Sequence, residues 1–280
     1  MRVRYPFSPP HDASRVDHVG TYTRSLPVSL TRMYENALDW AHLPHLHGSS
    51  FQSIDCEDSG GWGWRAKVVD AKGRASVLEL RLDRQRRRWI TRNLEGPSLG
   101  AEIWTHAFVT APRALDLVID FFVPGVAVDD RNKVGRAYAR AYETLYDEDV
   151  FMMTERQRVI DLRLDGIRRD ATLTLPIPPS EALPLVVDLS NRPFILNRYE
   201  DDWVIYPAMC PHQLGPLTGD VDDQGRVHCP WHGYAFDVRS GECVTGAGCR
   251  FGERPVVDVD DGTMTLRWSG EDSAGSISRR

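Results

Sequence analysis

The chain has 280 residues, of which 41% are hydrophobic and 26% charged, an ordinary composition for a globular protein that can hold two modest cores. Its formal net charge of −6 at pH 7 argues against a general nucleic-acid binder. No apolar run is long enough to cross a membrane and the first residues contain no signal-peptide core, so we expect a protein of the reducing cytoplasm that makes no membrane contact.

A cluster of acidic and histidine residues lies early in the chain. Residues 35–43 contain no helix breaker and are predicted to be helical, which would place Asp39 and His42 on one face. The proline that follows would end or kink this helix and turn His47 back toward the same point. Two imidazoles and a carboxylate would then converge, which is the donor set of a mononuclear iron site with open positions. From the residues alone, His45 could equally be one of the two histidine ligands.

Five strand-like runs follow this cluster, separated by turn residues. Each alternates apolar and polar residues, which predicts an antiparallel sheet with one buried face. The runs are residues 61–70, 76–82, 88–92, 102–109 and 115–123.

A long helix is predicted over residues 132–161, which contain no proline and a single glycine. A strand meander followed by such a helix is typical of a helix-grip (START-like) fold, an α+β architecture in which the sheet curls around the helix and leaves a cavity. We expect this cavity to hold an apolar substrate. Four aromatic residues are candidates for its lining, although a core position is the commoner role for each: Trp64, Trp104, Phe108 and Phe121.

The proline-rich segment 176–184 is predicted to be a semi-rigid linker. It would separate a first domain, residues 1–175, from a second domain, residues 185–270, in which short strand-like runs predict an all-β structure. The last ten residues, 271–280, are polar and are predicted to form a disordered tail.

Two cysteine–histidine pairs lie in the second domain, Cys210-Pro-His212 and Cys229-Pro-Trp-His232, with sixteen residues between them. Each pair supplies one thiolate and one imidazole, as an iron–sulfur cluster with one cysteine-ligated and one histidine-ligated iron requires. A structural zinc site is the alternative, but zinc pairs usually come as C-x-x-C with histidine partners elsewhere. The remaining cysteines are predicted to be free thiols without chemistry: Cys56, Cys243 and Cys249.

Both loops resemble the two cluster loops of Rieske ferredoxins and Rieske oxygenases, over roughly residues 184–268. The resemblance implies a Rieske [2Fe-2S] cluster on the two cysteine–histidine pairs. The upstream cluster is similar to the mononuclear-iron motif of Rieske oxygenase α-subunits, N-x-x-D-x-x-H-x-x-x-x-H. Four residues fill that motif without a gap: Asn36, Asp39, His42 and His47.

This second resemblance implies an Fe(II) held by His42 and His47, and it leaves His45 outside the motif. It also implies that Asp39 is a bridge, which accepts a hydrogen bond from a cluster histidine of a neighbouring subunit and carries electrons to the iron.

The third iron ligand implied by the resemblance is Asp149, because residues 146–157 are similar to the acidic stretch of the family. The chain departs from the family pattern at Thr154, where a glutamate is usual. Asp147 and Glu148 are expected to belong to a solvated acidic face of the long helix.

The order of the two domains is reversed relative to Rieske oxygenases, which place the cluster domain first, so the chain resembles a circular permutant. The resemblance implies a terminal oxygenase, monooxygenase or dioxygenase, that hydroxylates, demethylates or otherwise oxidises a small, largely apolar substrate with O₂. Its partners would be an NAD(P)H-dependent reductase and in some systems a ferredoxin. The resemblance implies a homotrimer, and the new linker would either preserve that trimer or let the cluster and the iron of one chain approach each other. The alternative is a Rieske electron-transfer protein fused to a helix-grip domain that binds a ligand without chemistry.

Overall fold

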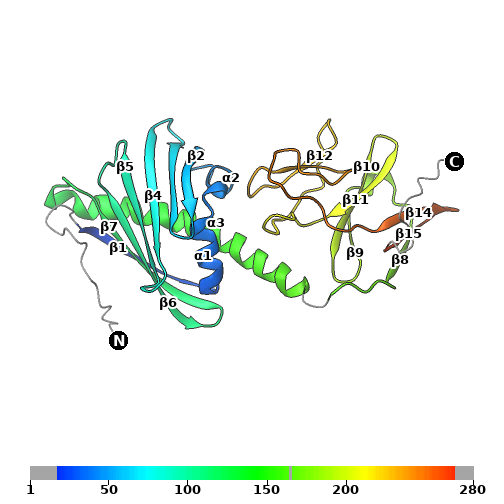
Figure 1. Cartoon of the computed structure of the whole chain (residues 1–280), viewed down its shortest axis with the longest axis horizontal. Helices are drawn as coiled ribbons and strands as arrows, with labels where there is room; N and C mark the ends of the chain where they lie inside the picture. Colours follow the sequence, from blue (N-terminus) through cyan, green and yellow to red (C-terminus); the bar gives the residue numbers. More distant parts are fainter. Residues whose placement is uncertain (1–17, 164–165, 269–280) are drawn as a thin grey trace. The chain divides into compact units, whose positions relative to one another are not determined.

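Figure 1 shows the computed structural model of the chain, which describes residues 18–163 and 166–268. The chain divides into two compact units after Thr154. The predicted tail, residues 271–280, lies outside the described residues. The predicted domain bounds stay a prediction. Among the described residues, no helix combines the length and the apolar character needed to cross a membrane.

Seven antiparallel strands form one sheet in the N-terminal unit, in the order β1-β7-β6-β5-β4-β3-β2. They are β1 (His18–Leu26), β2 (Phe51–Gly60), β3 (Gly63–Asp70), β4 (Ala75–Asp83), β5 (Arg88–Glu95), β6 (Glu102–Ala111) and β7 (Ala114–Phe122). The five predicted runs correspond to β3–β7. Prediction missed the two edge strands, because β1 buries only its second and last residues and β2 buries none, so neither shows a clear apolar alternation.

Helix α3 (Arg131–Arg163), which follows the short turn η2 (Val128–Asp130), confirms the predicted long helix. Its N-terminal part packs on one face of the sheet, where the Phe121 ring lies 5.3 Å from the rings of both Tyr138 and Tyr142, centroid to centroid. The single glycine of the helix, Gly135, allows this approach, because a Cβ there would lie 2.3 Å from the carbonyl oxygen of Val19 on β1. A curved antiparallel sheet packed on a long helix is the expected helix-grip architecture.

The chain between β1 and β2 differs from the single predicted helix over residues 35–43. Helix α1 (Leu30–Leu38) starts at Ser29, whose side chain accepts a hydrogen bond from the Arg32 amide, and it ends before Asp39. A 3₁₀ turn, η1 (Trp40–His42), and a short helix, α2 (Leu43–Leu46), follow. Pro44 lies in the first turn of α2, where its missing N–H costs no intrahelical bond. The proline therefore begins the second helix, and the prediction that it ends the first was wrong.

The second unit is an all-β structure apart from the end of α3 and the turn η3 (Ser180–Ala182). Strands β11-β10-β9 form one sheet, β14-β15-β8 a second, and β12-β13 a hairpin. They are β8 (Thr172–Pro176), β9 (Leu185–Asp188), β10 (Pro193–Tyr199), β11 (Asp202–Pro207), β12 (Arg226–His228), β13 (Ala235–Asp237), β14 (Val256–Asp260) and β15 (Thr263–Arg267). Apolar residues of the first two sheets form one core, which includes Phe194, Leu196 and Trp268.

Candidate metal centres

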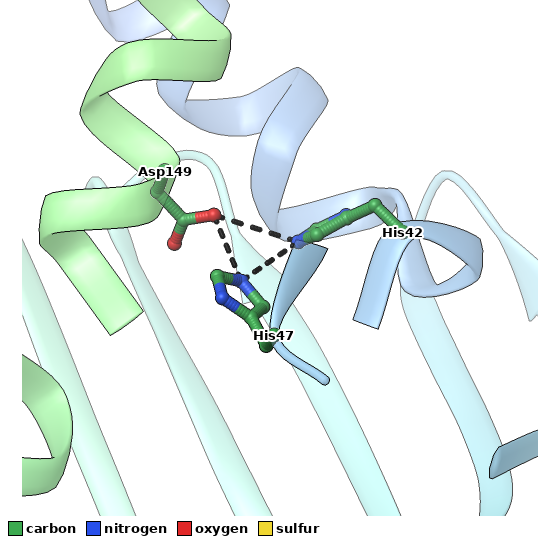
Figure 2. A group of neighbouring side chains, drawn as sticks. All are labelled: His42, His47 and Asp149. Atoms are coloured by element: carbon green, nitrogen blue, oxygen red, sulfur yellow. Dashed lines mark hydrogen bonds and ion pairs between the residues drawn. The ribbon is translucent and has the colours of Figure 1, made fainter. Parts of the chain in front are cut away.

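Three side chains of the N-terminal unit converge on one point (Figure 2). His42 ends η1, His47 follows α2, and Asp149 comes from the middle of α3. The Nε2 atoms of the two histidines are 3.2 Å apart, and Oδ1 of Asp149 lies 3.0 Å from His47 Nε2 and 3.5 Å from His42 Nε2. All three residues are buried, with exposed fractions of 3%, 1% and 7% in chain order. We call these residues the donor triad.

The spacing of the donor triad fits a metal ion. Two atoms that bind one ion at about 2.1 Å, with an angle of about 90–110° between them, lie about 3.0–3.4 Å apart. The three separations in the triad span 3.0–3.5 Å. Two imidazoles and one carboxylate form the facial donor set of non-haem iron sites, which leaves further positions open.

Two neighbouring side chains orient the donor triad. Glu148 accepts a hydrogen bond of 2.6 Å from Nδ1 of His47, which turns Nε2 of that ring toward the centre. Asn36 donates a hydrogen bond of 2.8 Å to Oδ1 of Asp149. Sequence reasoning assigned Glu148 to a solvated helix face, and this expectation was wrong. The signal that could have found it is its position next to Asp149 in the acidic stretch.

The structure places two residues whose roles were open in the sequence, His45 and Asp147. His45 is exposed on α2 and does not belong to the donor triad, whereas His42 and His47 both do. Asp147 is largely exposed and forms an ion pair of 2.5 Å with Arg24, as expected for a solvated acid.

Asp39 and Asp149 determine the electrostatics of His42. Oδ2 of Asp39 lies 3.6 Å from Nδ1 of His42, on the side of the ring away from Nε2. Burial lowers the pKa of His42, but the two carboxylates outweigh burial and raise that pKa to about 9. Burial raises the pKa of Asp149, and the hydrogen bonds with His42 and His47 outweigh it and hold that pKa well below its usual range. Without a metal, the triad is therefore an ion-paired cluster, and a metal would have to displace a proton from it.

A cavity of about 280 Å³ lies beside the donor triad, between the helices and strands β3–β6. Of the four aromatic candidates for its lining, Trp64 does line it. The other three candidates, Trp104, Phe108 and Phe121, are not among its described lining residues. Trp104 follows a lining residue of β6 and so faces the opposite side of the sheet, where the Arg88 guanidinium lies 4.8 Å from its ring centroid.

The second centre lies in the two cysteine–histidine loops, which close in the same way. In the first loop, the Cys210 amide donates to Gly215 O at 2.7 Å, and the Leu214 amide donates to Cys210 O at 2.9 Å. In the second loop, the Cys229 amide donates to Tyr234 O, and the Gly233 amide donates to Cys229 O, both at 2.8 Å. Leu214 and Gly233, each four residues after the cysteine, have φ of 66° and 65°. Glycine adopts this conformation freely, whereas Leu214 does so as a buried core residue.

The four predicted cluster ligands lie together. The Cys210 and Cys229 thiols are buried and hydrogen-bond to each other. The His212 and His232 rings are perpendicular, with centroids 4.6 Å apart. Two adjacent thiols and two adjacent imidazoles fit a cluster in which one iron binds two cysteines and the other binds two histidines.

The contact between the two thiols shifts their pKa values in opposite directions. Contact with Cys210, aided by His232, lowers the pKa of Cys229 to about 5 against the opposing effect of burial. The same contact raises the pKa of Cys210. Cysteines bind iron as thiolates, so one of the two is already close to its metal-binding form.

The loops also pack against each other. A Cβ at Gly215 would lie 2.7 Å from the indole of Trp231, which is 1% exposed. The other three cysteines are free thiols, and no disulfide occurs in the part of the chain that the structure describes.

Comparison with known proteins identifies the family of the domain that contains the two cysteine–histidine loops. Residues 175–250 match the family model described as the Rieske [2Fe-2S] domain. The C-terminal unit contains a Rieske domain. Pheophorbide a oxygenase of Oryza sativa subsp. japonica, a chloroplast protein, is 35% identical over 66 residues, 22% of this chain and 12% of that protein. Methylxanthine N1-demethylase NdmA of Pseudomonas putida is 30% identical over 71 residues, 25% of this chain and 20% of that protein.

These matches show weak homology to Rieske oxygenases, and the chain spans a fifth or less of the length of these two relatives. Among solved structures, the aromatase/cyclase Zhui from Streptomyces sp. R1128 aligns with 17% identity and a TM-score of 0.41, over 52% of this chain and 98% of that structure.

Proposed function

We propose that the chain is the terminal oxygenase component of a Rieske system, which oxidises a small organic molecule with O₂ and electrons from NAD(P)H. One observation carries the proposal: the donor triad lies beside a cavity in a chain that also contains a Rieske domain. A pure electron carrier needs neither a second buried donor set nor a ligand-sized cavity next to it.

The residues that would hold each cofactor follow from the two centres. The cysteine–histidine loops would hold the [2Fe-2S] cluster, and His42, His47 and Asp149 would hold Fe(II). When bound, the cluster would supply single electrons, and the Fe(II) would couple the reduction of O₂ to the oxidation of the substrate. Glu148 would hold the imidazole of His47 in register, and Asn36 would do the same for the carboxylate of Asp149.

Asp39 is proposed as the link between the two centres. Its carboxylate approaches the back of the His42 ring, so it would position this ligand and accept a hydrogen bond from a cluster histidine of a neighbouring subunit. That arrangement needs an oligomer, for which we propose a homotrimer. An NAD(P)H-dependent reductase, alone or through a ferredoxin, would supply the electrons.

The order of the units supports a circular permutation. The helix-grip unit comes first and the Rieske domain second, the reverse of the order in Rieske oxygenases. A permutation relocates one linker and leaves both cores intact, so it is compatible with the same chemistry.

The first experiment measures iron and acid-labile sulfide per chain in anaerobically purified protein. Wild type is expected to hold about three irons and two sulfides, and the double variant His42→Ala/His47→Ala about two of each. His45→Ala is the matched control, because it removes an exposed histidine from the same segment. About two irons in wild type and double variant alike, even after reconstitution with Fe(II), would refute the oxygenase and favour an electron carrier fused to a ligand-binding domain.

A further inference from the structure

Two of the β5 side chains that line the cavity are polar, whereas their cross-strand neighbours on β4 and β6 are apolar. Thr91 and Asn93 alternate along β5 and both line the cavity. Across the sheet, the neighbours of Thr91 are Leu80 and Ile103. Asn93 lies opposite Leu78. A polar side chain on the inner face of a sheet costs stability unless it gains a hydrogen bond. Thr91 gains one from Tyr142, so Asn93 is the residue whose place on this face indicates a function.

Three residues form this part of the cavity, which we call the polar wall: Thr91, Asn93 and Ser98. The hydroxyls of Thr91 and Tyr142 are hydrogen-bonded to each other. The Asn93 amide donates to Ala101 O at 3.0 Å, and the Gly100 amide donates to Asn93 O at 2.9 Å. These two bonds close the turn between β5 and β6, and Ser98 lies in that turn. The Asn93 carboxamide and the Ser98 hydroxyl offer both donors and an acceptor to a ligand in the cavity.

The polar wall lies away from the donor triad. Tyr142, which contacts the polar wall, precedes Asp149 by seven residues on α3, a separation of about 10 Å along the helix axis. Leu145 and Tyr146 line the cavity between these two positions. A ligand that fills the cavity would therefore have one end at the triad and the other at the polar wall.

The charge of the cavity limits the ligand further. Among the described lining residues there is no lysine or arginine, and the only carboxylates are Asp39 and Asp149 at the triad end. A carboxylate, sulfonate or phosphate at the polar wall would lose its hydration without gaining a cation. The volume of about 280 Å³ is close to the lower end of the range of about 300–1,000 Å³ for small-molecule sites, which favours a small ligand.

We infer that the substrate is a neutral, flat compound of one or two rings, with a hydroxyl or carbonyl group that Asn93 and Ser98 bind while the opposite end lies at the donor triad. Indole and phenol side chains of the wall, such as Trp64, Trp89 and Tyr146, favour a flat ring system. This inference rests on the proposed function, because it names the substrate class of the same site. It makes Asn93 and Ser98 specificity-determining residues.

Equilibrium dialysis of the full chain with its metal centres, without O₂ or reductant, tests the inference. The probes are 2-naphthol, which is neutral and can hydrogen-bond, 2-methylnaphthalene, which cannot, and 2-naphthoate, which is an anion at neutral pH. We expect 2-naphthol to bind at least about tenfold more tightly than 2-naphthoate, because the cavity offers the anion no cation. Equal or tighter binding of 2-naphthoate would overturn the inference.

Variants of the polar wall give a second, independent test. Asn93→Leu should weaken binding of 2-naphthol about three- to tenfold and leave 2-methylnaphthalene unchanged or tighter, because only the hydroxyl loses a partner. Ser98→Ala should act in the same direction and carries little risk to folding, because it lies in a turn. Asn132→Leu, at an exposed site on α3, is the control. If both polar-wall variants bind 2-naphthol like wild type, the inference fails.

These measurements involve no turnover, so they separate the two proposals. Selective binding of 2-naphthol together with an empty donor triad would refute the oxygenase and leave the ligand class standing. A filled triad with no selectivity among the three probes would refute the ligand class and leave the oxygenase standing.

Discussion

The two candidate metal centres of this chain are held in place in different ways. In the Rieske domain, the ligands come from two short loops sixteen residues apart, and two backbone hydrogen bonds close each loop. In the helix-grip unit, His47 and Asp149 are 102 residues apart, and side chains such as Glu148 and Asn36 orient them. One centre is therefore shaped by the main chain and the other by a network of side chains.

This difference predicts how each centre responds to substitution. A loop closed by backbone bonds keeps its shape when a side chain near it changes, so only ligands and residues with special backbone roles should matter there. A donor set oriented by side chains should lose affinity stepwise, by an amount that depends on which partner is removed.

The largest effect is expected at the cluster ligands. Cys210→Ser should remove the whole cluster, about two irons and two sulfides per chain, because both irons depend on intact loop ligation. Loss of visible absorbance and of acid-labile sulfide measures this. The iron at the donor triad should stay, and Cys56→Ser, in β2, should change neither centre. Loss of iron from both centres in Cys210→Ser would contradict their independence.

The acidic stretch of α3 offers a graded test of the side-chain network. Asp149→Asn should weaken Fe(II) binding at the triad by more than about 100-fold, because a donor atom is lost, and Glu148→Gln by about 10-fold, because the partner of His47 is weakened. Asp147→Asn is the control, since its side chain is largely exposed. Anaerobic titration against a competing chelator measures all three. Equal affinities for Glu148→Gln and Asp147→Asn would remove Glu148 from the network.

A smaller but more specific effect is expected at Asp39. Asp39→Ala should keep the iron and sulfide content of wild type, yet lower reductase-coupled turnover about 10- to 100-fold, because His42 loses its neighbour and the proposed electron relay is broken. Asp55→Ala, at an exposed site on β2, is the control. Turnover at the wild-type rate in Asp39→Ala would exclude Asp39 from the relay.

The two centres were predictable from the sequence to different degrees, for the same structural reason. The Cys-Pro-His212 and Cys-Pro-Trp-His232 pairs could be found because the ligands of each loop are neighbours in the sequence. Local spacing predicted that His42 and His47 converge, but no local pattern links residues 102 apart, so only the resemblance to a known motif suggested Asp149 as the third member. Glu148 was missed because its role depends on which face of α3 meets His47.

Prediction of the fold from the sequence was limited in a similar way. The helix at 131–163 and strands β3–β7 have strong periodicity and few breakers, and they were predicted. The end of helix α1 before Asp39 was not predicted. Residues 35–43 contain neither glycine nor proline, so the end of the helix depends on tertiary packing. The left-handed conformation of Leu214 gave no signal either, because the side chain suggests an ordinary core residue.

The smallest effect is expected at the backbone of the cluster loops. Gly215→Ala should destabilise the Rieske domain by about 1–3 kcal/mol, because the added Cβ would overlap the buried indole of Trp231. Denaturant unfolding followed by the visible absorbance of the cluster measures this, with Gly252→Ala as the control, since no atom lies within 4 Å of the Cβ position there. The N-terminal unit should unfold as in wild type. Equal stability of the cluster in Gly215→Ala and in the control would mean that Trp231 moves aside for the added methyl group. The close packing of the two loops would then not contribute to cluster stability.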